Sequence, residues 1–275
     1  MRRVKDYIRS ALYHIRHNMS FAVFYVLGTA LTFVFIAIVL QLVYAVIGNE
    51  PPLVNADRVI YIDEFEDAEG YPVYGLPVDE IDIFMKGLHG YEACAMAHSE
   101  FVDVFTENTF VPQPVDYVNA DYWKVFQFNF VEGRAFSPEE YEKKQSVAVI
   151  TKSMANLLFK NESAIGKKIE CQKVIYRITG VVEDFSIFTT EISSKCWLSN
   201  KYNTFTPSGD KYYEVYVLFP VDQDMDMAKQ EIAGKIKDFY SRRGKEVILS
   251  GETLYTVKED LVRGVGVNLL SYGVW

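Results

Sequence analysis

Two residues close in sequence have the side chains that zinc prefers. Cys94 and His98 are four positions apart, and thiolates and imidazoles are the usual ligands of this metal. Residues 91–104 read as one or two strands, however, and in a strand two residues at this spacing lie about 13 Å apart at ~3.3 Å per residue. We therefore expect no metal site at Cys94 and His98.

A lysine-containing segment partly matches a phosphate-binding loop. It reads Asn161-Glu162-Ser163-Ala164-Ile165-Gly166-Lys167-Lys168. Asn161 stands where such a loop needs its first glycine, and Lys168 stands where it needs the Ser or Thr that binds Mg²⁺. The sequence thus predicts that this chain holds no ATP and no other cofactor.

Residues for nucleophilic and carboxylate chemistry are sparse. After the apolar segment there are two histidines, His89 and His98, too few to build a Ser-His-Asp arrangement. The acidic group 63–67 lacks the ordered glycine and distal glutamate of a calcium loop, and 222–226 reads as a solvated loop. We predict that the chain is not an enzyme and has no catalytic, cofactor-binding or metal-binding residues.

Three cysteines, Cys94, Cys171 and Cys196, allow one disulfide at most. Three pairings are possible, and the sequence does not choose between them. The interpretation we favour is that all three are buried as small apolar residues.

Aromatic residues are the best candidates for a binding surface. They are densest at Tyr117, Tyr122, Trp123, Phe126, Phe128 and Phe130. Alternation in a strand buries every second side chain, so we expect half or more of them in the core. The others would form a contact surface for a partner or a second protomer.

One apolar run determines where these residues are placed. Residues Phe21 to Ile47 carry no charge, and a helix of this length, about 40 Å, exceeds a hydrocarbon core of about 30 Å. The run is too long for the apolar part of a cleavable signal peptide, and it lacks the polar positions of a soluble core helix. We predict a transmembrane helix over residues 19–48.

Charge predicts the orientation of this helix. Residues 1–18 have a net charge of +4, and the whole chain has −9, so the remainder is strongly acidic. By the positive-inside rule the N-terminus is cytoplasmic and the rest is exported. An acidic domain also argues against nucleic acid as a partner.

The leader itself has helical periodicity. Val4, Tyr7, Ile8, Ala11, Leu12 and Ile15 form one apolar stripe. Residues 1–18 therefore form a cytoplasmic amphipathic helix, which either lies on the lipid bilayer surface or continues the spanning helix inward. Asn18 and Ser20 offer a break and a new N-cap, which favours the surface helix.

Beyond the prolines at 51 and 52, periodicity predicts strand, helix and strand at both ends of the exported part. The first set is 58–63, 78–88 and 91–104, and the second is 212–219, 224–240 and 245–257. We predict an α+β protein with one N-terminal transmembrane helix and an extracytoplasmic α/β domain over 49–257. That domain has two βαβ units in a split lobe (58–111 and 212–257) and an inserted mixed α/β lobe (112–200).

The inserted lobe has its own expected elements. Strands are predicted at 115–118 and 146–150, short helices at 121–125 and 153–159, and a hairpin over 168–182. Gly133, Gly166 and Gly180 fall where the chain is expected to reverse, because glycine reaches positive φ at little steric cost.

Five segments of this lobe carry a family resemblance. They are Asn119-Ala120-Asp121-Tyr122-Trp123 with Phe126, Glu132-Gly133-Arg134-Ala135-Phe136-Ser137, Val147-Ala148-Val149-Ile150-Thr151, Ile165-Gly166-Lys167-Lys168-Ile169, and Tyr176 to Asp184. In this order and spacing they resemble the MacB-like periplasmic core domain of FtsX/MacB-type ABC transporter permeases.

The resemblance covers residues 1 to about 257 and implies a function. Such permeases have a first spanning helix, a large outer domain and three more spanning helices, and they form homo- or heterodimers on a cytoplasmic ABC ATPase subunit. ATP would bind only to that partner, and its motion would pass to a periplasmic protein partner or substrate, which is called mechanotransmission. The implied location is the bacterial inner (cytoplasmic) membrane.

Residues 258–275 depart from this plan. They contain no run near 20 apolar residues, so we expect a stump that precedes a missing second transmembrane helix, and hence a truncated permease. The alternative is a single-pass anchored extracytoplasmic sensor or scaffold domain without ATP coupling.

Overall fold

The computed structural model describes residues 7, 13, 16–62, 64–74, 76–77, 81, 84–107, 109–160, 162–185, 192, 194–199, 212–249 and 254–263. The chain divides into two compact units, Met1–Gly48 and Asn49–Trp275. Each unit is described by itself, and the second is called the β-rich domain.

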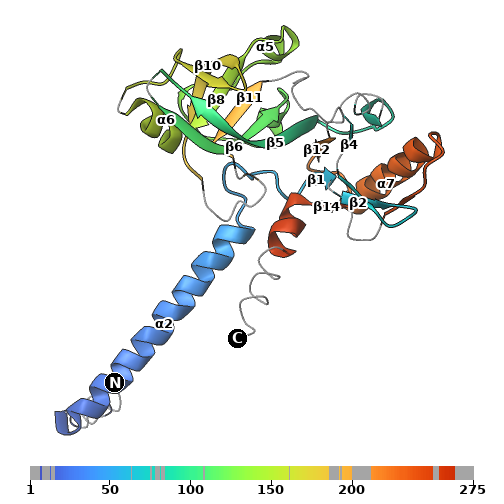
Figure 1. The fold of residues 1–275 in the computed structure, drawn as a ribbon. Helices are drawn as coiled ribbons and strands as arrows, with labels where there is room; N and C mark the ends of the chain where they lie inside the picture. Colours follow the sequence, from blue (N-terminus) through green and yellow to red (C-terminus); the bar gives the residue numbers. More distant parts are fainter. Residues whose placement is uncertain are drawn as a thin grey trace. The chain divides into compact units, whose positions relative to one another are not determined.

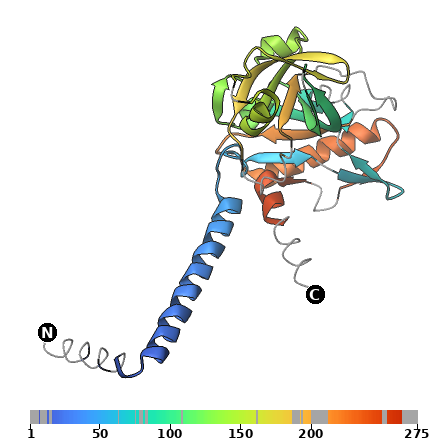
Figure 2. The ribbon, with the colours of Figure 1, turned by 60° about the vertical axis from the view of Figure 1, so that its left-hand side comes forward.

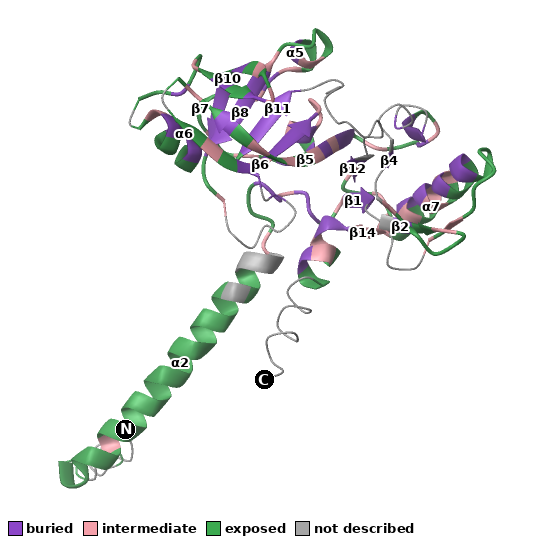
Figure 3. Ribbon diagram, in the orientation of Figure 1, coloured by how far each residue is buried: buried purple, intermediate pink, exposed green. Residues whose placement is uncertain are grey.

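Helix α2 (Met19–Ile47) makes up most of the first unit. Its residues Met19–Gln41 are long and apolar enough to cross a membrane, and none of them is buried, as the exposed ribbon in Figure 3 shows. The hydroxyls of Thr29 and Thr32 donate to the carbonyls of Tyr25 and Gly28, each at 2.9 Å. Internal satisfaction of polar groups is what a lipid environment requires.

Little of the predicted leader helix is described. Tyr7, Tyr13, Arg16 and His17 are helical, and Asn18 forms a bend before α2. Asn18 occupies the N-cap position, but its side chain makes no capping hydrogen bond. The stripe residues Val4, Ile8, Ala11, Leu12 and Ile15 lie outside the described residues.

A four-stranded antiparallel sheet forms one half of the β-rich domain (Figure 1). Its strands are β1 (Val59–Ile62), β5 (Ala93–Phe105), β12 (Tyr212–Leu218) and β14 (Leu254–Thr256). Their order is β14-β1-β12-β5. The two predicted βαβ units therefore interleave, because a strand of one unit lies between the two strands of the other, as in split βαβ folds.

Two helical segments cover one face of this sheet. Residues 81 and 84–86 are helical, and α7 (Met225–Ser241) begins at Asp224, whose carboxylate accepts the N–H groups of two first-turn residues. The rings of Phe84 and Phe239 meet edge to face, 6.5 Å apart. The predicted apolar face of α7 is confirmed, since Ala228, Ile232, Ile236 and Phe239 are all buried in this core.

The other half of the β-rich domain is a closed barrel, which can be followed in Figure 2. Around the ring, β5 pairs with β6, then come β11, β8, β10 and β9, and β9 pairs back to β5. The added strands are β6 (Phe110–Val118), β8 (Val147–Thr151), β9 (Lys168–Cys171), β10 (Val174–Val182) and β11 (Cys196–Ser199). Closure leaves a second core inside the ring, lined by Val104, Tyr117, Ile150 and their neighbours.

Smaller elements complete the domain. Helix α6 (Lys152–Phe159) follows β8, and β7 (Phe130–Gly133) pairs with the end of β10. Helices α4 (Tyr122–Val125) and α5 (Pro138–Glu142) lie in the connections. Strands β13 (Val247–Ile248), β2 (Glu64–Asp67) and β3 (Pro72–Tyr74) form a small separate sheet, and β4 (Leu76–Pro77) pairs with β12. Residues 257–263 form the outgoing helix.

Most predicted elements are confirmed within a few residues, and three expectations are corrected. The predicted strand 245–257 is instead two short strands, β13 and β14, in different sheets. The expected lobe boundary between 111 and 112 falls inside β6, because the barrel already begins in β5, where Ala97 pairs with both β12 and β6. Gly180 is not at a reversal but inside β10.

Candidate functional site: the junction where the chain enters and leaves the domain

The chain enters and leaves the β-rich domain at neighbouring strands. β1 and β14 pair antiparallel, with Ile60 opposite Thr256. Beyond this ladder, the backbone N–H of Lys258 donates to the carbonyl of Ala56 at 2.9 Å, and its ammonium donates to Asn49 Oδ1 at 3.3 Å. We call residues 49–58 and 256–263 the junction.

The incoming half of the junction is fixed by one arginine. The guanidinium of Arg58 donates to Asn55 Oδ1 at 2.9 Å, to Glu92 Oε2 at 2.9 Å, and to the carbonyl of Phe219. Asn55, which is buried, in turn donates to the carbonyl of Val125 at 3.3 Å. The incoming chain is therefore bonded to α4 and to the residues next to β5 and β12.

The outgoing half is capped and anchored. Glu259 accepts the N–H of Thr256 at 2.6 Å and donates its own N–H to the Thr256 hydroxyl at 3.2 Å, which is a reciprocal capping box. The Lys229 ammonium of α7 donates to both Glu259 oxygens, at 2.6 and 2.8 Å. Val257 and Leu261 of the outgoing helix are buried. The outgoing helix is therefore joined to α7 by charge-assisted hydrogen bonds.

An aromatic cluster connects the barrel to the four-stranded sheet. The Trp197 indole donates to the Tyr122 hydroxyl at 3.2 Å, and the Trp123 ring lies 6.1 Å from the Trp197 ring. On the other side, Phe126 meets the ring of Tyr216 in β12 edge to face at 5.0 Å. Aromatic packing of this kind resists hinge motion between the halves, since each ring loses contacts when they separate.

The expected distribution of these aromatics is confirmed. Tyr117, Tyr122 and Phe126 are buried, whereas Trp123, Phe128 and Phe130 are half-buried. Tyr117 points into the barrel core rather than toward the cluster. The use of the half-buried rings as a partner surface stays a prediction.

Cys94 and His98 both lie in β5, as predicted. Cys94 belongs to the apolar core of the sheet, whereas His98 Nε2 lies 3.1 Å from Glu100 Oε1 inside one end of the barrel. The part of the chain that the structure describes has no group of three metal-ligating residues.

The lysine of the loop at 161–168 has other partners. The Lys167 ammonium donates to Glu162 at 2.6 Å and lies 4.7 Å from the centre of the Phe159 ring. Gly166 adopts φ +80° in a turn, and Lys168 already begins β9. Asn161 lies outside the described residues.

One carboxylate of each acidic group accepts backbone hydrogen bonds. Asp67 accepts the N–H groups of Glu69 and Tyr71 at 3.1 and 2.8 Å in a turn, and Asp224 caps α7. Asp63 lies outside the described residues.

All three cysteines are free and buried, as the favoured interpretation predicted. Burial raises the pKa of the Cys171 thiol to about 12, and it also raises the pKa of Cys196. A thiol that stays protonated is a poor nucleophile, so the structure gives these residues a packing role.

One buried carboxylate was not found by sequence reasoning. Asp116 in β6 is 4% exposed and accepts the hydroxyls of Ser99, at 2.5 Å, and Ser194. Burial raises its pKa above 3.8, and the two hydroxyls partly oppose this shift. Its position in an alternating strand gave no signal, because Ser194 is distant in sequence and arrives only when β11 docks.

Three comparisons place the domain among known proteins. Residues 22–235 match the family model described as MacB-like periplasmic core domain. The periplasmic region of MacB from Actinobacillus actinomycetemcomitans superimposes with a TM-score of 0.58 at 16% identity, over 78% of this chain and 94% of that one. The extracellular domain of the ABC-type transporter YknZ from Gram-positive bacteria gives 0.55 at 18% identity, over 70% and 100%.

A curated relative matches a shorter stretch. The macrolide export ATP-binding/permease protein MacB of Marinobacter nauticus is 36% identical over 58 residues, which is 21% of this chain and 9% of that protein. The match therefore spans only a small part of the relative's length.

Proposed function

Because this chain belongs to the MacB-like periplasmic core domain family, we propose that it passes ATP-driven motion from a partner ATPase to the outside of the membrane. In this proposal it is a permease component of a FtsX/MacB-type ABC transporter, anchored by α2. It binds no ATP and catalyses no reaction itself. The sensor or scaffold alternative differs in having no ATP coupling.

The junction is the observation that carries this proposal. A relay needs its input to reach the whole domain without being absorbed by a flexible connection. Here the incoming and outgoing chains pair with each other through β1 and β14, and each is bonded to the body of the domain by Arg58 and Glu259. Motion applied at the junction would therefore shift the domain as one piece.

The proposed partners follow from the same picture. A cytoplasmic ABC ATPase supplies the motion, a second permease protomer, identical or not, completes the dimer, and a periplasmic protein or substrate receives the output. The N-terminus is proposed to face the cytoplasm of the inner membrane, with the β-rich domain on the other side.

Coupling can be tested on the full chain. The tagged protein is crosslinked mildly in native membranes and purified, and its partners are identified by mass spectrometry. We expect an ABC ATPase to co-purify. Hydrogen exchange is then followed with and without ATP, and peptides of the junction should change. Peptides of β8, which is wholly buried, provide the internal reference. If no ATPase is recovered and hydrogen exchange is unchanged by ATP, the interpretation as an anchored sensor or scaffold replaces the relay proposal.

Orientation is tested with single cysteines. The three natural cysteines are buried, so their background labelling is low. A maleimide that cannot cross membranes should label Lys143→Cys in intact spheroplasts, and Arg16→Cys only after the membrane is opened. The reverse pattern would invert the proposed orientation.

A further inference from the structure

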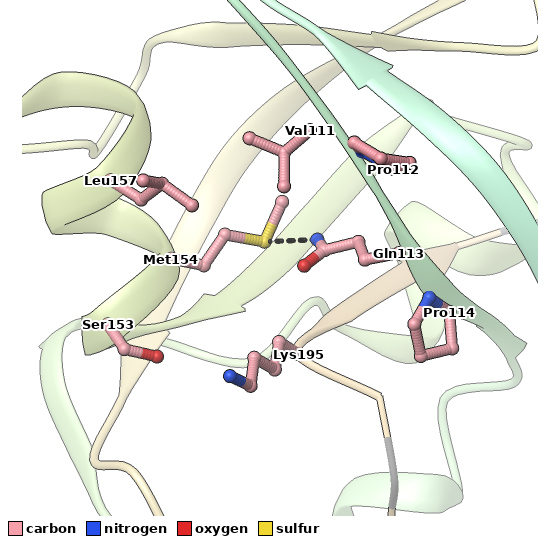
Figure 4. Close-up of a pocket in the computed structure, with 8 residues that line it drawn as sticks. All are labelled: Val111, Pro112, Gln113, Pro114, Ser153, Met154, Leu157 and Lys195. Atoms are coloured by element: carbon pink, nitrogen blue, oxygen red, sulfur yellow. Dashed lines mark hydrogen bonds between the residues drawn. The ribbon is translucent and has the colours of Figure 1, made fainter.

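A cavity of about 430 Å³ lies between β6 and α6 (Figure 4). It exists because β6 has a free edge there. β11 pairs with β6 only over Asp116–Val118, and within the described ranges residues 110–115 pair with β5 alone. Pro112 and Pro114 have no N–H to offer another strand, which keeps such an edge unpaired. The cavity is within the size range of small-molecule sites.

The walls of the cavity are mainly apolar. Val111, Pro112 and Pro114 form one side, and Met154 and Leu157 of α6 form the other. Met154 is buried, but Leu157 is 60% exposed. An exposed leucine at the rim of an apolar cavity is free to cover the apolar part of a ligand.

Polar groups gather at one end of the cavity. In the described part of the chain, Lys195 is exposed and its ammonium makes no ion pair or hydrogen bond. Ser153 contributes a hydroxyl, which also lies 3.1 Å from that of Thr151. The nearby Asp184 carboxylate accepts the backbone N–H of Ser153 at 3.1 Å, so its charge is held at the start of α6.

A buried amide faces the same space. Gln113 is 8% exposed, and its amide nitrogen donates to Met154 Sδ at 2.8 Å. Sulfur of a thioether is a weak acceptor, so this donor is poorly satisfied for a buried group. Buried polar groups usually have strong partners, and a ligand oxygen would supply one.

We propose that this cavity binds a small amphipathic carboxylate dissolved in the surrounding water. Its carboxylate lies between the Lys195 ammonium and the Ser153 hydroxyl, and the Gln113 amide is in reach of a second oxygen. Its apolar part lies between Leu157 and Pro112. The site is distinct from the junction, and it does not depend on ATP coupling.

The test uses 4-(4-fluorophenyl)butyrate as the probe and the full chain in nanodiscs. Binding is followed by fluorine NMR, and empty nanodiscs measure partition into lipid. We expect saturable binding to the protein. Lys195→Gln should weaken it about five-fold or more, whereas 4-(4-fluorophenyl)butan-1-ol, which lacks the carboxylate, should bind this variant and the unaltered chain equally. Leu157→Ser should weaken both probes.

Matched controls separate the site from general effects. Lys168→Gln removes an exposed lysine of β9, and Ile175→Ser removes an apolar side chain that is 56% exposed, compared with 60% for Leu157. Neither should change binding. The proposal is overturned if the probe does not saturate above empty nanodiscs, or if the control variants lose as much affinity as the cavity variants. Circular dichroism of each variant shows that the fold is kept.

Discussion

Gly133 and Gly180 face each other across β7 and β10 and allow a very close backbone approach. A Cβ at Gly133 would lie 2.1 Å from the carbonyl oxygen of Thr179 and 2.7 Å from Ile165 Cδ1. A Cβ at Gly180 would lie 2.5 Å from the carbonyl oxygen of Arg134. Alanine at either position must therefore push the two strands apart.

The cost of each substitution follows from its geometry. Gly133→Ala adds left-handed strain of about 1–2 kcal/mol at φ +66°. It also weakens the bond from the Arg134 N–H to the Thr179 carbonyl, for about 1 kcal/mol, and overpacks the site for about 1–3 kcal/mol. A total near 4 kcal/mol is expected. Gly180→Ala has no left-handed strain, so about 3 kcal/mol is expected from the same two sources.

Two other glycines provide controls. Gly166 also has positive φ, +80°, but a Cβ there would meet nothing within 4 Å, so Gly166→Ala should cost only the strain, about 1–2 kcal/mol. Gly234 lies inside α7, again with nothing within 4 Å, and Gly234→Ala should stabilise the helix by about 1 kcal/mol.

Thermal unfolding of the full chain in nanodiscs, followed by tryptophan fluorescence, to which the buried Trp197 contributes, measures these differences. For a domain of this size 1 kcal/mol shifts Tm by roughly 2–4 °C. We expect losses of about 12 °C for Gly133→Ala, about 9 °C for Gly180→Ala and about 4 °C for Gly166→Ala, and a small gain for Gly234→Ala. If Gly133→Ala and Gly166→Ala have the same Tm, the close approach of β7 and β10 does not determine the cost of a side chain at residue 133.

Three further predictions concern titratable groups. Asp116→Asn keeps an acceptor for the two serines but removes the buried charge. Burial raises the pKa of Asp116 above 3.8 in the folded chain. The unaltered chain should therefore lose stability as the pH rises from 3.8 to this folded pKa, by up to ~1.4 kcal/mol per pH unit. Urea unfolding at several pH values should show this pH dependence in the unaltered chain but not in the variant. The variant should also be more stable at neutral pH. Equal pH dependence in the two proteins would contradict the burial argument. Arg134 holds the pKa of Glu140 below 4.5, so Glu140→Gln should cost about 1 kcal/mol above that pH, and the difference should shrink as pH falls through the folded pKa. Cys171 and Cys196, whose pKa values are raised by burial, should resist maleimide at neutral pH until urea is added, as mass spectrometry can show; a disulfide in the native protein would refute this.

Elements with strong local patterns could be predicted from the sequence. The apolar face of α7, the apolar run of β8 and the alternation in β10 are each determined by adjacent residues, and their observed bounds differ from expectation by one or two positions. Closure of the barrel could not be predicted in this way. It depends on Val104 of β5 pairing with Cys171 of β9, two residues far apart in sequence that share no local signal.

The same distinction explains the candidate site. The sequence predicts the apolar helix α2 and strands near β1 and β14, but it does not predict that β1 and β14 pair. β14 is only three residues long, and the sequence pattern places it within one longer strand. The sequence places Gly180 at a chain reversal because glycine is common in turns. In the fold, a glycine is needed at 180 because the neighbouring strand β7 approaches too closely for a side chain. The bonds of Arg58 and Lys229 likewise join distant segments, so only the folded chain brings them to the junction.

One strand explains how the two halves can act together. The 13 residues of β5 serve the four-stranded sheet at one end and the barrel at the other, and Ala97 pairs in both. β1, which follows the incoming half of the junction, pairs with β12, and β12 pairs with β5. Displacement of β1 is therefore passed across two antiparallel ladders to a strand that is itself a wall of the closed barrel. Because the barrel strands pair in a ring that closes through β9 and β5, we expect the barrel to follow β5 as one body, which is the property that the proposed relay requires.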